Sequence, residues 1–301
     1  AFNAHWHGRP YERGKGYTAF KRWEWWMEQR VDATGRRPDP AVFAHAVKDL
    51  RRVELLQGEK SNADWQPMGP TSWTNWDSGY NPGNGRVNCV AVDPTDASII
   101  YCGTPAGGLW KSTDNGQTWG PLFTDLPTLG VSGIAIDPTD PDIIYCATGD
   151  GDGTDTYSMG VIKSTDGGGS WNTTGLDWQT TAARTTRMLR MHPTDALTLF
   201  CATNNGLWKT EDGGANWIQA ATGSFYDVEF KPDDPGIIYA CGDQFFRSLN
   251  GGTSFDLSDV GLPDPSEVNR MRIAITPADP FKVYVLCGRQ DDDSFLGLYR
   301  S

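Results

Sequence analysis

The sequence predicts an all-β fold of repeated four-stranded units, and three observations support this prediction. A phrase of an apolar strand, a Ser or Thr, an Asp–Gly turn and an aromatic residue recurs along the 301 residues. A second phrase, which reads strand, Pro-Asp turn, strand, alternates with the first. The prolines of the second phrase are spaced 44, 55, 39 and 45 residues apart, at Pro94, Pro138, Pro193, Pro232 and Pro277. These spacings match the blades of a β-propeller.

The first phrase encodes a tight turn by local chemistry. It reads GLWKSTDNGQTW up to Trp119, and it ends again at Trp171, at Trp217 and, in weakened form, at Phe255. We expect each Asp to accept hydrogen bonds from backbone N–H groups two residues on, and each Gly to adopt positive φ. The predicted structural residues of the three full copies are Ser112, Asp114, Gly116, Trp119, Ser164, Asp166, Gly168, Trp171, Thr210, Asp212, Gly214 and Trp217.

The second phrase encodes the first two strands of each blade. It reads VAVDPTDASIIYC from Val90 and recurs four times, the last time as IAITPADPFKVYVLC from Ile273. Blades are therefore expected to start near residues 86, 130, 185, 224 and 269. The fifth blade begins its third strand as GLYRS at Gly297. Because five starts leave the ring unfinished, we expect a truncated chain, the front portion of a longer protein.

The N-terminal region differs from the repeats. Residues 17–31 and 40–57 space their apolar residues as helices do, so residues 1–62 are predicted to form a helical arm before a propeller at 63–301. Within the propeller, the stretch from Trp65 to Met68 resembles the outer strand that follows each repeated turn, but no inner strands of its own precede it. We expect them to close the ring, since propellers protect their open sheet edges in this way.

Composition limits the possible functions. The net charge is −12, and residues beyond 60 hold 14 Lys and Arg against 30 Asp and Glu. Such an acidic body disfavours nucleic acids and anionic lipids as partners. The sequence contains no run of eighteen apolar residues, so no transmembrane segment is predicted. The chain opens with Ala1, which favours a secreted or cell-surface protein whose signal has been removed.

Six cysteines occur without metal-ligand spacing, and three of them occupy one repeat position after an aromatic residue. Buried thiols are the preferred interpretation, although disulfides remain open. His5 and His7 flank Trp6 but have no further ligands nearby, so the pair predicts no metal site.

Candidate ligand-binding residues lie in the loops between second and third strands and near the first strands. Because both regions lie on the face opposite the turns, we expect one binding face. The candidates are Asp150, Asp152, Asp155, Tyr157, Asp291, Asp293, Arg187 and Arg270. Alternate carboxylates at Asp150, Asp152 and Asp155 resemble part of a Ca²⁺ loop, although the closing Glu is missing. The alternatives are a Ca²⁺ site and a solvated acidic loop.

The repeated turn resembles the Asp box of the BNR-repeat β-propellers, which include sialidases, xyloglucan-cleaving glycosidases and the sortilin (VPS10) family. In those families the box is a structural turn. Together with the arm KGYTAFKRWEWWMEQRV and the loop CATGDGDGTDTYSMGVIKS, it is similar to secreted sortilin-like propellers of Bacteroidota. This resemblance implies export by the type IX secretion machinery.

Two functions follow from this resemblance. The first is a secreted or surface propeller without catalysis that binds protein or glycan through an acidic face. The alternative is a sialidase-like or xyloglucanase-like glycoside hydrolase using carboxylates on that face. Xyloglucan-cleaving relatives carry an essential Asp in the loop before the first box, where this chain has GTPAGG from Gly103. The sialidase Arg-Ile-Pro signature is also missing, so the first function is the expectation.

Overall fold

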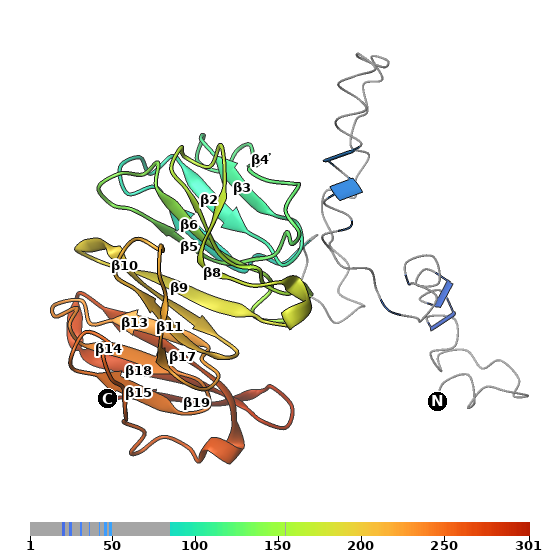
Figure 1. Ribbon diagram of the computed structural model, residues 1–301. Coiled ribbons are helices and arrows are strands. Elements are labelled where there is room, and N and C mark those ends of the chain that lie inside the picture. The colour runs from blue at the N-terminus through green and yellow to red at the C-terminus, as the bar shows by residue number, and fades with distance from the viewer. Residues whose placement is uncertain are drawn as a thin grey trace, which may run out of the picture.

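The computed structural model describes residues 85–153 and 155–301, together with isolated positions between residues 20 and 49. Five antiparallel sheets follow one another along the chain (Figure 1). The first is β1 (Cys89–Val92), β2 (Ile100–Gly103), β3 (Leu109–Ser112) and β4 (Gly120–Pro121). The second is β5 (Val131–Ile136), β6 (Ile144–Thr148), β7 (Gly160–Ser164) and β8 (Asn172–Asp177).

The remaining sheets repeat this order. The third is β9 (Thr186–His192), β10 (Asp195–Thr203), β11 (Gly206–Thr210) and β12 (Ile218–Ala221). The fourth is β13 (Asp227–Phe230), β14 (Ile238–Cys241), β15 (Phe245–Ser248) and β16 (Asp256–Leu257). The fifth is β17 (Val268–Thr276), β18 (Asp279–Arg289) and β19 (Phe295–Arg300). Two short 3₁₀ helices, η1 (Thr180–Ala182) and η2 (Pro265–Glu267), precede β9 and β17. The predicted all-β fold of four-stranded blades is confirmed, with a fifth sheet of three described strands.

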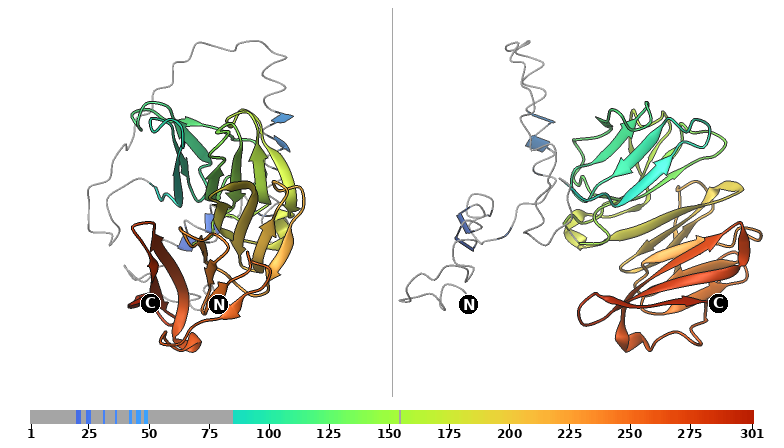
Figure 2. Two further views of the ribbon diagram at one scale, coloured as in Figure 1. Left: turned by 90° about the vertical axis from the view of Figure 1, so that its left-hand side faces the viewer. Right: turned by 180° about the vertical axis from the view of Figure 1, so that it is seen from behind.

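The sheets are arranged as blades in an arc (Figure 2, left). Contacts run between successive first strands, from β1 to β5, β5 to β9, β9 to β13 and β13 to β17. The first strands therefore line the inside of the arc, and the short outer strands β4 and β16 lie farthest from it. The 55-residue spacing in the sequence reflects the long β6–β7 loop and η1, which both add residues outside the strands.

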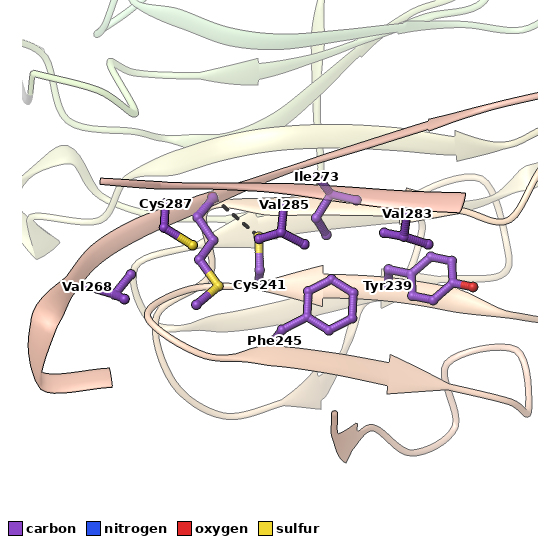
Figure 3. Packing of buried hydrophobic residues seen from close by; sticks show 9 residues of the cluster. Tyr239, Cys241, Phe245, Val268, Ile273, Val283, Val285 and Cys287 are labelled. Atoms are coloured by element: carbon purple, nitrogen blue, oxygen red, sulfur yellow. Dashed lines mark hydrogen bonds between the residues drawn. The ribbon is translucent and has the colours of Figure 1, made fainter. Parts of the chain in front are cut away.

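Hydrophobic clusters fill the space between neighbouring blades. Figure 3 shows the cluster between the fourth and fifth sheets, where Tyr239 and Phe245 face Val283 and Val285. Three further clusters join the first and second, second and third, and third and fourth sheets in the same way. Each of the three middle blades thus has a packed neighbour on both faces, whereas Val90 and Val92 of the first blade and Leu298 of the fifth are exposed on the side without a described neighbour.

The repeated turn has a defined hydrogen-bond pattern. The Ser112 hydroxyl donates to Asp114 Oδ1 at 2.8 Å, and the backbone N–H of Thr118 donates to the same oxygen at 2.8 Å. The Asp therefore reaches the N–H four residues on, and not two as expected, because the turn loops back across the side chain. Gly116 adopts φ 80°, and the Trp119 indole donates to its carbonyl at 3.0 Å.

The same pattern occurs in the other blades. Asp166 accepts from Ser164 and Ser170, and Asp212 accepts from Thr210 and Asn216. In the fourth blade, Asn250 replaces the Asp, and its Oδ1 still accepts from the Ser248 hydroxyl and the Ser254 N–H. A neutral acceptor is therefore sufficient for the geometry of this turn.

Each turn docks on the preceding blade. The Tyr145 hydroxyl of the second blade donates to Gly213 O of the third-blade turn at 3.0 Å. Phe200 of the third blade lies beneath Gly252 of the fourth-blade turn, where an added Cβ would be 2.3 Å from Phe200 Cζ. Positive φ and this close approach together require glycine at Gly252.

All six cysteines are free thiols, and four of them are buried. Burial raises the pKa of Cys89 to about 12 and that of Cys287 to about 11. The predicted arm at 1–62, with His5 and His7, lies outside the described residues apart from the isolated positions, and the predicted closing strand at 65–68 lies outside them entirely. Within the described residues, no helix has the length and apolar character needed to cross a bilayer.

The natural Asn250 suggests a test of the charged turns. Hydrogen bonds from the hydroxyl and N–H of Ser170 and from Ser164 lower the pKa of Asp166 to about 2, below the value of about 3.9 in an unfolded chain. Its stabilisation is therefore complete above pH 4 and is lost as the pH falls towards 2. We expect Asp166→Asn to reduce the fall in Tm between pH 4 and 2, and Asn250→Asp to increase it, by circular dichroism.

Asp256→Asn is the matched control, because it removes the same charge from the exposed strand β16 outside any repeated turn. An Asp166→Asn protein whose Tm falls as steeply as that of the wild type would contradict this prediction.

Candidate functional site

A cavity of about 510 Å³ lies on the inside of the arc, where the first strands begin. We call it the axial pocket. Its walls come from the start of the first, third and fifth blades and from the β6–β7 and β18–β19 loops. The charged residues that line it are Arg86, Asp152, Arg187, Arg270, Arg272 and Asp293. Its volume is within the range of about 300–1,000 Å³ that is usual for ligand sites.

The arginines reach the axial pocket because of strand geometry. Arg270 and Arg272 are two residues apart on β17, so their side chains leave the same face of the sheet. Arg187 is the second residue of β9, and Arg86 comes three residues before β1. Four guanidinium groups from three blades therefore line one cavity.

The segment Ser224–Tyr226, which precedes β13, holds two of these arginines. Arg187 stacks over the Tyr226 ring, 3.5 Å from its centroid, and donates from Nη1 to Ser224 Oγ at 2.7 Å. Arg272 donates from Nη1 to Tyr226 O at 2.8 Å. Because β13 lies between β9 and β17, this segment can anchor an arginine from each side.

Asp150 forms the base of the β6–β7 loop. Its side chain is fully buried, and it accepts from Arg86 at 2.5 Å and from Asn88 at 3.1 Å. Backbone N–H groups of Gly153 and Asp155 also donate to it at 3.0 Å. Burial raises the pKa of this carboxyl, but the backbone N–H groups of Asp155 and Asp152 and the Arg86 guanidinium outweigh it, so the pKa is lowered. Asp150 thus fixes the loop.

Asp152 connects distant blades across the axial pocket. It accepts a hydrogen bond from Arg270, 118 residues away in the sequence, and lies 3.5 Å from Arg86. In the β18–β19 loop, Asp293 adopts φ 60° and accepts from the Asn269 amide. Asp152 and Asp293 are the two carboxylates among the described residues that line this cavity.

The predicted Ca²⁺ ligands surround a protein cation. Arg86 lies 2.5 Å from Asp150, 3.5 Å from Asp152 and 3.6 Å from Asp155. Among the residues described, no group of three or more His, Cys, Asp and Glu side chains is arranged to hold a metal ion. The sequence left a Ca²⁺ site and a solvated acidic loop as alternatives, and in the structure a guanidinium lies among these carboxylates.

The other predicted ligand-binding residues are placed as follows. Asp152, Asp293, Arg187 and Arg270 line the axial pocket, and Asp150 is buried beneath its wall. Tyr157, Asp155 and Asp291 are exposed and do not line it. The expected acidic face is therefore a mixed face with a basic cavity at its centre.

Sequence analysis missed two arginines as site residues, Arg86 and Arg272. Arg86 could have been found by its position, because it lies just before a first strand, and Arg187 and Arg270 lie within the first three residues of theirs. Arg272 could have been found from the period of two along a strand. Residues two apart point to the same face of a sheet, as Arg270 and Arg272 do on β17.

No family model matches the sequence. Over 123 residues it is 32% identical to a xyloglucanase of a Paenibacillus species, which covers 38% of this chain and 12% of that relative. Over 86 residues it is 37% identical to a xyloglucanase of Acetivibrio thermocellus, which covers 24% of the chain and 10% of the relative. The chain thus spans about a tenth of the length of the curated relatives it matches.

Solved structures give a consistent fold. The match to an ancestral GH74 enzyme covers 80% of this chain and 33% of the enzyme's chain, with a TM-score of 0.59 and 18% sequence identity. The match to the GH74 xyloglucanase of Xanthomonas campestris covers 72% of this chain and 36% of the xyloglucanase chain, with a TM-score of 0.56 and 21% sequence identity. The fold is a β-propeller.

These comparisons correct the expected function. A propeller that binds without catalysis was the main expectation, but the sequence relatives are xyloglucanases. The alternative of a glycoside hydrolase is therefore better supported than the binding function.

The loop anchor can be tested by removing the Asp150 carboxylate. Asp150→Ala leaves Arg86 without its closest partner and frees the N–H groups of Gly153 and Asp155. We expect the free energy of unfolding in urea at pH 7 to fall by about 2 kcal/mol. This is less than for a fully buried pair, because the Arg86 side chain is 40% exposed and water screens it.

Asp155→Ala is the control, since its carboxylate is 3.6 Å from Arg86 and its side chain is 63% exposed. We expect it to change the unfolding free energy by less than about 0.5 kcal/mol. Equal losses in the two variants would show that Asp150 does not anchor the loop.

Proposed function

We propose that this chain is part of a glycoside hydrolase, and that the axial pocket takes part in the cleavage of a polysaccharide. The observation that carries the proposal is the sequence similarity of 32–37% identity to xyloglucanases. The fold and a cavity with two carboxylates in its wall support it. Xyloglucan is therefore the first substrate to test.

Glycoside hydrolysis needs a proton donor and a second carboxylate that acts as base or nucleophile. In this proposal Asp152 is one of these two carboxylates, and the guanidinium groups of Arg270 and Arg86 orient it. Asp293 is the other, and the Asn269 amide orients it by donating a hydrogen bond. The two residues come from the second and fifth blades and line one cavity.

The loop before the first repeated turn supplies no carboxylate. Residues 103–108 read GTPAGG; the Thr104 N–H donates to Gly108 O within this loop, and the Gly108 N–H donates to Leu129 O before the second blade. The proposal therefore assigns the acid and base roles to the β6–β7 and β18–β19 loops.

A location outside the cytoplasm belongs to the same proposal, because polysaccharides of this kind are extracellular polymers. The resemblance to sortilin-like propellers of Bacteroidota supports secretion or a cell-surface position, and it implies the type IX machinery as the export partner. A glycan is the proposed binding partner.

Activity can be tested by the release of reducing ends from xyloglucan by the 301-residue chain. We expect Asp152→Asn and Asp293→Asn each to reduce the rate at least 100-fold, since loss of general acid–base catalysis costs about 10²–10⁴-fold. Asp291→Asn is the matched control, two residues from Asp293 and outside the pocket wall, and we expect it to retain the wild-type rate.

Two results would contradict this proposal. One is a folded wild-type chain that binds xyloglucan but releases no reducing ends. The other is hydrolysis that continues unchanged in the Asp152→Asn, Asp293→Asn double variant.

The proposed location can be checked by immunodetection of the protein in the medium and cell fractions of the source organism. We expect it in the medium or on the cell surface, and in the cells only when type IX secretion is inactivated. Detection in the cytosol of secretion-competent cells would contradict this part of the proposal.

A further inference from the structure

Two arginines of the axial pocket have no carboxylate partner in the described part of the chain. The contacts of Arg187 are the Tyr226 ring, Ser224 Oγ and Phe225 O. The hydrogen bond of Arg272 is to Tyr226 O. All of these partners are uncharged, so both guanidinium groups keep their full positive charge beside the cavity.

Other arginines nearby are paired with acids. Arg190, three residues from Arg187 on β9, is 2.5 Å from Glu229. Arg86 pairs with Asp150, and Arg270 pairs with Asp152. In the described part of the chain, no carboxylate lies within ion-pair distance of Arg187 or Arg272, and the charge of Asp227 acts on Arg272 only from farther away.

Arg187 also has an unused donor. Its Nε is buried and has no hydrogen-bond partner among the described residues. Burial lowers the pKa of Arg187, the charges of Arg272 and Arg270 lower it further, and the nearby Tyr226 opposes this effect. A buried, unpaired donor among like charges is unfavourable, and a bound anion would remove both costs.

The wall beside these arginines is apolar. Val87, Leu286 and Phe295 line the same cavity and are 51%, 45% and 66% exposed. Ligand sites combine apolar and aromatic walls with a few charged groups that fix orientation. A ligand that matches both features has an anionic group and a less polar face, as a sugar ring with a carboxylate does.

We propose that the axial pocket binds the carboxylate of a uronic acid residue in a glycan, with Arg187 and Arg272 as the anion-binding residues. Planar guanidinium groups form paired hydrogen bonds with planar carboxylates, which favours a carboxylate over a neutral hydroxyl at this position. The choice of a sugar rests on the proposed function, whereas the anion site rests on the arginines alone.

Isothermal titration of the 301-residue chain with trigalacturonate, and with maltotriose as the neutral trisaccharide, tests the proposal. We expect trigalacturonate to bind at least tenfold more tightly at low ionic strength. Arg187→Gln and Arg272→Gln should each weaken this binding at least tenfold. Arg187→Lys, which keeps the charge but loses the fork, should give an intermediate affinity.

Arg247→Gln is the matched control, because it removes the same charge from β15, outside the axial pocket. It should leave the affinity unchanged. Unfolding curves show which variants are folded. If Arg187→Gln does not fold, the Arg272→Gln and Arg187→Lys proteins carry the test.

Equal affinity for the two trisaccharides would overturn the proposal, as would wild-type affinity in folded Arg187→Gln and Arg272→Gln proteins. Titration with sodium sulfate that shows binding, while trigalacturonate does not bind, would also overturn it. The proposed function fails separately: a chain that binds trigalacturonate but hydrolyses neither xyloglucan nor an acidic glycan retains the anion site and loses the enzymatic assignment.

Discussion

The packing of a repeated turn against an aromatic residue of the preceding blade, seen in the third and fourth blades, holds neighbouring blades together. Phe200 is fully buried beneath the Gly252 turn, and Tyr145 donates to the backbone of the Gly213 turn. Full burial of one such ring contributes about 2–3 kcal/mol. Because the turn supplies the backbone and the preceding blade supplies the ring, these contacts hold consecutive blades in a defined relative position.

This order places the first strands on the inside of the arc and brings their starts together. Residues far apart in the sequence then meet, as Asp152 and Arg270 do across the axial pocket. The turns themselves lie at the other ends of the strands, where their hydrogen bonds stabilise the blades. The turns and the proposed site thus lie on opposite faces of one repeat, so the loops that line the axial pocket can vary without disturbing the turns.

Local charge differs from overall charge in this molecule. The chain carries a net charge of −12, yet four arginines line its axial pocket. The acidic β6–β7 loop neutralises Arg86 and Arg270 and leaves Arg187 and Arg272 available. Net charge describes the field that a partner meets at a distance, whereas these pairings decide what the cavity accepts.

The sequence by itself determined the blades, because each one is encoded by short-range signals. Asp166, Gly168 and Trp171 specify their turn within eight residues, and the spacing of the Pro-Asp phrases gives the period. Even the Asn250 turn could be recognised from its glycines and hydroxyls. The candidate site was only partly predictable: its acidic loops and two of its arginines were visible as composition. Only the tertiary structure decided that Arg86 lies among the carboxylates for which Ca²⁺ was one alternative, and that Arg187 and Arg272 form no ion pair with the described residues. The reason is physical: turns depend on neighbours in sequence, whereas ion pairing depends on distances between blades that only packing of the buried aromatic residues sets.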